Sequence, residues 1–196
     1  MFALVRPALA ALGLFTILLG LAYPLAITGV AQAAFPAQAN GSMIRVGNQP
    51  IGSRLIGQAF ARPQYLHGRP SAAGAEGYDA SASSGSNLGP LNPDLFKRIK
   101  DTAAALRRED GVTTLPADAV TTSASGLDPD VSPANAAMQA ARIAAARGVR
   151  VDQVQAVIAR HVEGRTFGVL GQPRVNVLET NLDLDATFGE HRAVSR

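Results

Sequence analysis

The sequence contains no cysteine, and no charged residue lies between Arg6 and Arg45. Without cysteine there are no disulfide bonds and no thiolate metal sites, so the core has to be stable through burial alone. From Arg45 onward, 17 basic and 15 acidic side chains nearly balance, with a net charge of +2. Such a surface lacks the basic field that nucleic acid requires, and nucleic acid is therefore excluded as a partner.

Several sequence patterns of enzyme sites are also missing. The phosphate-binding pattern GxxxxGKS/T does not occur, since neither Lys97 nor Lys100 follows a glycine, and GxSxG, HExxH and calcium-binding loops are absent. The histidines His67, His161 and His191 are scattered, and no second histidine or cysteine lies at ligand spacing. We therefore predict no catalytic residue, no metal site and no nucleotide hydrolysis by this chain alone.

What the sequence does have is a long apolar stretch from Pro7 to Ala34. It exceeds the ~20 residues that a helix needs to cross a bilayer, which predicts a transmembrane helix over residues 7–34. Pro24 is expected to kink this helix or to mark its outer turn. Ala31-Gln32-Ala33 also matches a signal-peptidase site, and cleavage there would release the rest of the chain. The apolar run from Leu9 to Val30 is longer than the about 7 to 15 residues of a signal peptide, which favours a retained anchor.

The charge bias around this stretch predicts its orientation. Arg6 and the α-amino group are the only basic groups before it, which favours a cytoplasmic N-terminus at residues 1–6 and an exported body. Residues 35–50 read as a connector. The remaining residues, 51–196, suit one compact extracytoplasmic domain.

Three helices are predicted in this domain. Asn92 and Pro93 are a cap and a first helical residue, and the helix is expected to end near Asp110-Gly111. The remaining two are expected from Ser132-Pro133 to Gly148, and from a cap at Asp152 to a stop at Gly164.

Strands are predicted between and around these helices, which makes the domain α+β. Residues 52–60 read as a strand or extended segment, 119–122 as a short edge strand and 174–178 as an alternating strand. Residues 71–92 have the composition of a flexible linker. Asp128-Pro129-Asp130 is interpreted as a turn in preference to a cation site, because it lacks the further carboxylates and glycine of a calcium loop.

One loop has features of a binding site as well as of a structural loop. Residues 83–93, SSGSNLGPLNP, combine small residues, two asparagines and two prolines just before a helix N-terminus, where free N–H groups can hold an anion or a partner's carboxylate. A structural loop whose glycines take positive φ is the alternative that the residues alone favour. The candidate partner-interface residues are Ser86, Asn87, Gly89 and Asn92.

The same loop, extended to SGSNLGPLNPDL, closely resembles the C subunit of the Kdp-type potassium-transporting ATPase. Other segments match motifs of that family in the same order along nearly the whole chain, including the single N-terminal membrane helix. They are GSRLIGQAF (residues 52–60), GRPSAA (68–73), LPADAVTTSASGLDP (115–129), ARIAAARG (141–148) and GQPRVNVL (171–178).

The resemblance implies a non-catalytic, single-pass subunit of a bacterial inner-membrane complex that imports potassium with the energy of ATP. Its implied partners are a potassium-translocating subunit, an ATP-hydrolysing P-type subunit and a small membrane subunit. The family's C subunit is described as stabilising the assembly and as a catalytic chaperone that raises the ATP affinity of the pump subunit. Gln139 and Gln58 match the family's motifs as candidate nucleotide contacts.

The predicted orientation conflicts with direct nucleotide contact, because a periplasmic domain meets no ATP. An external cap over the potassium entrance, without nucleotide contact, is therefore an alternative function. A released periplasmic binding protein would require cleavage before Ala34. An exported hydrolase would require Ser86 to pair with His161 or His67 as its base.

Overall fold

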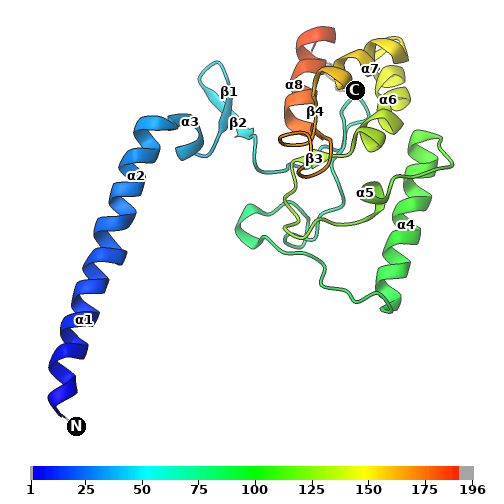
Figure 1. Ribbon diagram of the computed structural model, residues 1–196. Helices are drawn as coiled ribbons and strands as arrows, with labels where there is room; N and C mark the ends of the chain where they lie inside the picture. Colours follow the sequence, from blue (N-terminus) through cyan, green and yellow to red (C-terminus); the bar gives the residue numbers. More distant parts are fainter. Residues whose placement is uncertain (1, 190–196) are drawn as a thin grey trace. The chain divides into compact units, whose positions relative to one another are not determined.

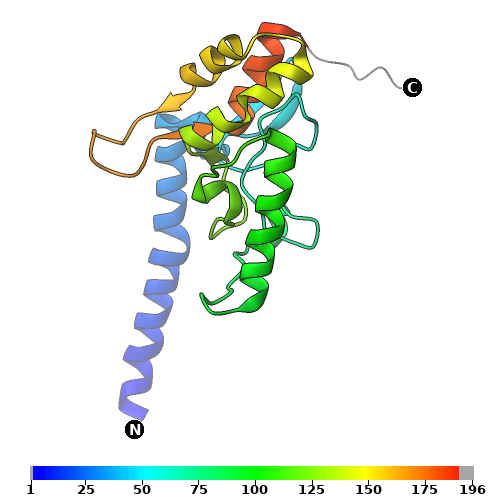
Figure 2. The same ribbon diagram turned by 90° about the vertical axis from the view of Figure 1, so that its right-hand side faces the viewer.

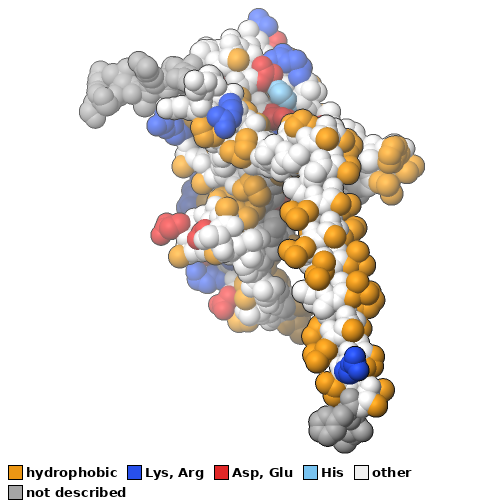
Figure 3. Space-filling view, turned by 90° about the vertical axis from the view of Figure 1, so that its left-hand side faces the viewer, with side chains coloured by type: hydrophobic (Ala, Val, Ile, Leu, Met, Phe, Trp, Pro, Cys, Tyr) orange, Lys and Arg blue, Asp and Glu red, His pale blue; other side chains and the backbone are white. Residues whose placement is uncertain are grey.

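The computed structural model describes residues 2–189, so His191 and Arg196 lie outside the described residues. The chain forms two compact units, Met1–Ile51 and Gly52–Arg196. Within the first unit, the apolar stretch is helical from Val5 to Ala34, and this helix of 30 residues is long and apolar enough to cross a membrane. Hydrophobic side chains cover it along its length (Figure 3).

The helix of the first unit has three parts. These are α1 (Val5–Ile17), a π-helical turn (Leu18–Ala22) and α2 (Tyr23–Ala34). In the π turn, the N–H of Tyr23 donates to the carbonyl of Leu18, five residues back. Pro24 follows directly. Because proline has no N–H and its ring presses on the carbonyl four residues earlier, a wider turn ahead of it lets the helix continue.

Short elements lie on both sides of this helix. A 3₁₀ turn (Phe2–Leu4) precedes the helix, and α3 (Pro36–Ala39) follows it. A hairpin then pairs β1 (Met43–Val46) with β2 (Gln49–Ser53).

The second unit contains helices and one small sheet, which confirms the α+β prediction (Figure 1). Its helices are α4 (Pro93–Asp110), α5 (Ala117–Val120), α6 (Pro133–Arg147), α7 (Val151–Arg160) and α8 (Val177–Phe188), with a 3₁₀ turn at Ala80–Ala82. In the sheet, β5 (Arg174–Asn176) lies between β3 (Asp130–Val131) and β4 (Val162–Glu163), antiparallel to both. The register places Val175 opposite Val131 and Val162.

The core of the second unit is built around α6, which packs against α4 and α7, while α8 packs against α7 (Figure 2). The buried residues of α6 include three alanines, Ala136, Ala140 and Ala144. Small side chains allow close approach of neighbouring helices, and burial of their apolar surface stabilises the unit. The core's larger side chains are Leu66, Ile143, Val154, Val157, Ile158, Val175, Val177 and Leu184.

The first two predicted helices of this unit are confirmed. Asn92 caps α4 by accepting from the N–H of Asp94 at 2.8 Å, and Gly111 ends the helix in the left-handed conformation. Ser132 caps α6 through the N–H of Asn135, and Gly148 ends it in the same way as Gly111. These caps satisfy backbone groups that a helix end leaves unpaired.

The third predicted helix exists with different ends. Arg150 occupies the cap position of α7, and Asp152 lies in its first turn instead of capping it. The helix ends at Arg160, with His161 at its C-cap, so Gly164 is not its stop.

The strand predictions need larger corrections. Residues 119–122 are not an edge strand, because α5 covers Ala117–Val120 and the Thr121 hydroxyl donates to the Ala117 carbonyl at 2.8 Å. Of residues 52–60, only Gly52 and Ser53 belong to a strand. The strand predicted over 174–178 stops at Asn176.

The helix α8 was not predicted. Asn176 caps it by accepting from the N–H of Glu179 at 3.1 Å. An asparagine followed three residues later by a glutamate is a sequence signal for a helix start. The alternating pattern of Arg174–Leu178 predicts a strand over the same residues, so the two signals conflict.

Candidate functional site

Half of the loop predicted to contact a partner, residues 83–93, is packed against another part of the domain. Its first half lies against residues 123–126: the N–H of Ser84 donates to the Ser125 carbonyl at 3.0 Å. A Cβ on Gly85 would come within 2.9 Å of the Ala124 carbonyl oxygen, so glycine is required by this close approach. The first half of the loop therefore has a structural role.

The second half of the loop carries the candidate interface residues. Ser86 is half-buried, Asn87 and Gly89 are exposed, and Asn87 has a left-handed backbone with φ of 50°. The side-chain oxygen of Asn92 is already used as the cap of α4. Asn87 and Gly89 are thus the members of this group most available to a partner.

Gln139 on α6 is buried, with 3% of its surface exposed. Its side-chain oxygen accepts from the N–H of His67 at 2.8 Å and from Arg142 Nη2 at 2.6 Å. Its side-chain nitrogen donates to the His67 carbonyl at 3.1 Å and to Asn135 Oδ1 at 2.9 Å. The amide therefore bonds to both backbone groups of His67 and uses its full hydrogen-bonding capacity within the chain.

Gln58, the other candidate nucleotide contact, is half-buried in a different environment. Its side-chain nitrogen packs on the backbone of Gly52, where an added Cβ would lie 1.9 Å from it. Glycine at position 52 is therefore needed to admit the Gln58 side chain.

The histidines have partners other than Ser86. Burial, assisted by the charge of Arg142, lowers the pKa of His67, whose ring Nε2 lies 3.0 Å from the Arg62 carbonyl. His161 Nε2 lies 2.8 Å from Asp183 Oδ2. Among residues 2–189, no hydrogen bond joins Ser86 to either histidine, so the structure assembles no nucleophile and base from this set.

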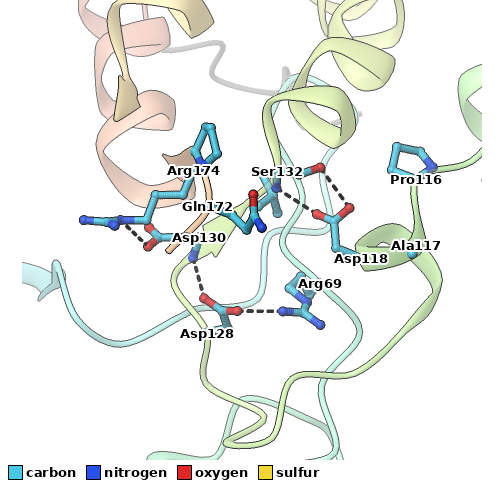
Figure 4. Close-up of a pocket in the computed structure, with 11 residues that line it drawn as sticks. Arg69, Pro116, Ala117, Asp118, Asp128, Asp130, Ser132, Gln172 and Arg174 are labelled. Carbon is cyan, nitrogen blue, oxygen red and sulfur yellow. Dashed lines mark hydrogen bonds and ion pairs between the residues drawn. The ribbon is translucent and has the colours of Figure 1, made fainter. Parts of the chain in front are cut away.

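A hollow of about 520 Å³ lies beside the sheet, lined by three carboxylates and two arginines (Figure 4). Arg69 Nη1 donates to Asp128 Oδ2 at 2.9 Å, and Arg174 Nε lies 3.1 Å from Asp130 Oδ2. Asp118 accepts from the N–H and the hydroxyl of Ser132 at 2.8 and 2.9 Å. Each carboxylate is thus bonded within the chain.

Asp128 and Asp130 of the predicted turn at Asp128-Pro129-Asp130 line this hollow. Asp128 Oδ1 accepts from the N–H of Asp130 at 3.1 Å, which closes the turn. Burial raises the pKa of Asp130, while a hydrogen bond from Asn176 opposes that shift. In the part of the chain that the structure describes, no group of three or more His, Cys, Asp or Glu could hold a metal ion.

A second hollow of about 360 Å³ shares Arg69 with the first and includes Phe60, His67 and Tyr78. The Tyr78 hydroxyl donates to the Arg69 carbonyl at 2.6 Å. Burial, strengthened by the charge of Asp128, raises the pKa of Tyr78 to about 12. The bond from Tyr78 to Arg69 holds the segment 69–78 in place.

The ion pairs of both hollows were not predicted from the sequence. Arg69 and Asp128 are 59 residues apart, and no local pattern relates them. Charge pairs of this kind order the loops that they connect.

Comparison with known proteins identifies the family of the chain. The family described as "KdpC: K+-transporting ATPase, c chain" matches residues 5–186. Three similar proteins carry the name potassium-transporting ATPase KdpC subunit. The one from Caulobacter sp. (strain K31) is 64% identical over 97% of both chains. That from Beijerinckia indica subsp. indica is 60% identical over 94% of both, and that from Koribacter versatilis is 57% identical over 88% of this chain and 89% of its own. The chain therefore belongs to the KdpC family, the c chains of K+-transporting ATPases.

Proposed function

We propose that the chain is a non-catalytic accessory subunit of an ATP-driven potassium importer in a bacterial inner membrane. Potassium is the transported ion of the complex. Its proposed partners are the potassium-translocating subunit, the ATP-hydrolysing P-type subunit and a small membrane subunit. The observation that carries the proposal is the family match over residues 5–186. In this role the chain stabilises the assembly and, as a catalytic chaperone, raises the ATP affinity of the P-type subunit.

We place residues 1–6 in the cytoplasm, 7–34 in the membrane, 35–50 as a connector and 51–196 as the periplasmic domain. The helical state of Ala31–Ala34 supports a retained anchor, because the bond after Ala33 lies inside α2 and a protease needs extended backbone. Mass spectrometry of the mature chain tests this. A mature chain beginning at Ala34 would contradict the anchor and favour a released binding protein.

The anchor also supplies the main test of assembly. Deletion of Pro7–Ala34 is expected to abolish co-purification with the P-type subunit, because lipid-buried partners contact this segment through helix packing. The intact chain, expressed at the same level, is the control. A truncated chain that still assembled fully would show that the membrane helix does not hold the complex together.

The second candidate function is an external cap over the potassium entrance with no nucleotide contact. Two observations favour it: the charge bias at Arg6 points to an external domain, and the Gln139 amide is buried and fully bonded. Gln58 and Gln139 stay the candidate contacts if nucleotide does reach the domain. A reporter active only in the periplasm, fused after Arg196, tests direct nucleotide contact, since activity there is incompatible with a cytoplasmic domain.

A further inference from the structure

The connection between β4 and β5 carries three exposed large apolar side chains on one short turn. Phe167 is 91% exposed, Val169 71% and Leu170 59%. Figure 2 shows this connection projecting from the side of the second unit. Single exposed apolar residues are normal on a soluble surface, but three within four positions of a projecting turn mark an interaction site. We call residues 165–171 the Phe167 turn.

The Phe167 turn is rigid. Thr166 and Leu170 exchange two backbone hydrogen bonds, each of 2.9 Å, and the N–H of Gly168 donates to the Arg165 carbonyl at 3.0 Å. A turn closed in this way presents its side chains in a fixed arrangement. Binding through it therefore loses little conformational entropy.

The backbone at the tip of the turn is strained. Phe167 has φ of 53°, in the left-handed region that a bulky side chain rarely adopts. Such strain persists where the surrounding structure enforces it, and it is concentrated at functional positions. At this position the strained backbone directs the Phe167 ring into solvent.

The charge at the base of the turn is positive. Arg165 donates to Gln172 Oε1 at 3.0 Å and has no carboxylate partner among residues 2–189. Residues 164–173 contain no acidic side chain. The complementary surface is therefore an apolar pocket whose rim offers an acceptor, such as a carboxylate, to the guanidinium.

We propose that the Phe167 turn inserts into an apolar pocket, rimmed by an acceptor for Arg165, on another subunit of the potassium-transporting ATPase. This inference rests on the proposed function, which supplies the partner. A protein pocket fits better than a lipid surface, because a lipid surface accepts any flexible apolar tip, whereas a rigid and strained turn gains affinity against a cavity of fixed shape. Exposed aromatic residues beside arginine are also the usual dominant contacts of protein interfaces.

The absence of cysteine allows a direct test. Val169→Cys in the full chain places one thiol on the turn, and Phe96→Cys places a control thiol on α4 at a side chain that is 59% exposed. Labelling with a maleimide is followed on the band of this chain. We expect the thiol at position 169 to react freely in the detergent-solubilised chain alone and at least about tenfold more slowly in the assembled complex. The thiol at position 96 is expected to react equally in both.

Two results would overturn the proposal. Equal labelling of position 169 in the free chain and in the complex would show that no subunit covers the turn. Protection of position 169 in the chain alone, reconstituted in lipid vesicles, would assign the turn to the bilayer surface.

A second variant tests the energetic role of the ring. Phe167→Asn is expected to keep the turn, because asparagine tolerates a left-handed backbone, and to leave the melting temperature unchanged. We expect it to associate with the other subunits at least about tenfold more weakly, while Phe96→Asn associates as the unmodified chain does. If the unmodified chain does not associate with the ATPase subunits, the proposed function fails. If it associates and Phe167→Asn associates equally well, only the present inference fails.

Discussion

Gln139, which motif resemblance suggests as a nucleotide contact, is buried and fully hydrogen-bonded in the folded chain. Its amide bonds to the backbone of His67 and to the side chains of Asn135 and Arg142. Gln139→Leu leaves these buried groups unsatisfied and is expected to lower the free energy of unfolding by about 3 kcal/mol. Chemical denaturation measures this loss, and Gln172→Ala, at an exposed site, is the control with a change of less than about 0.5 kcal/mol. A fully stable Gln139→Leu protein with weakened ATP binding in the complex would instead support a nucleotide contact.

The raised pKa of Tyr78 predicts that the stability of the fold depends on pH. Its pKa is raised to about 12 from an unfolded value of 10.0, so the fold favours the neutral phenol. This contribution is fully present below pH 10 and is lost as pH rises through 12, so stability is expected to fall between these values. Tyr78→Phe removes the titrating group, and its denaturation curves should show a smaller loss over the same interval. Identical losses in both proteins would assign the effect to other groups.

At the scale of elements, one buried ion pair connects the end of α4 to α6. Arg142 Nε lies 2.8 Å from Asp110 Oδ1, and the two side chains are 6% and 1% exposed. Asp110→Ala leaves the guanidinium buried without its main counter-charge, so we expect a loss of about 3 kcal/mol in unfolding free energy. Asp101→Ala breaks the exposed pair with Lys97 and is expected to change little. Equal melting temperatures for the two variants would contradict this ranking.

Variants of Asn92, at the start of α4, distinguish its role as a helix cap from a role as a partner contact. Asn92 accepts from the N–H of Asp94, so Asn92→Ala is expected to lower stability by about 1 kcal/mol, while Asn92→Ser keeps a capping oxygen and most of the stability. Thermal denaturation of both variants measures the cap. Loss of assembly in a stable Asn92→Ser protein would identify a partner contact in addition.

The elements that were predictable are those whose ends are encoded locally. Asn92-Pro93 and Ser132-Pro133 begin helices, and Gly111 and Gly148 end them, as their chemistry predicts. The Thr- and Val-rich sequence around α5 favours a strand, which is why the prediction there is wrong. In the structure, Asp118 of this helix is bonded to Ser132. Tertiary contacts decided the conformation there.

The candidate site was less predictable than the fold. The candidate nucleotide contacts Gln139 and Gln58 rest on resemblance to a family, and that resemblance does not tell which way their side chains face. The Gln139–His67 contact spans 72 residues, and the Arg69–Asp128 pair spans 59. Such pairs follow from packing, and a single sequence contains no local signal of them. The Phe167 turn was likewise not singled out, because its apolar residues fall in a short irregular segment without periodicity.

At the scale of the whole molecule, the hydrophobic core belongs entirely to the second unit. Residues 52–196 made without the first unit are therefore expected to fold and to unfold in one cooperative transition, because all of the core side chains are retained. Circular dichroism during heating measures this. Non-cooperative melting of the isolated unit would show that the first unit contributes to its stability.

The position of α8 in the chain has a consequence for the order of folding. Asn181 on this helix bonds to both the N–H and the carbonyl of Leu66, at 2.7 and 2.9 Å, across 115 residues of sequence. Leu184 from the same helix completes the core. The domain thus cannot close before α8 has been synthesised. A premature stop before Val177 removes α8 and should therefore yield a product that quality-control proteases degrade.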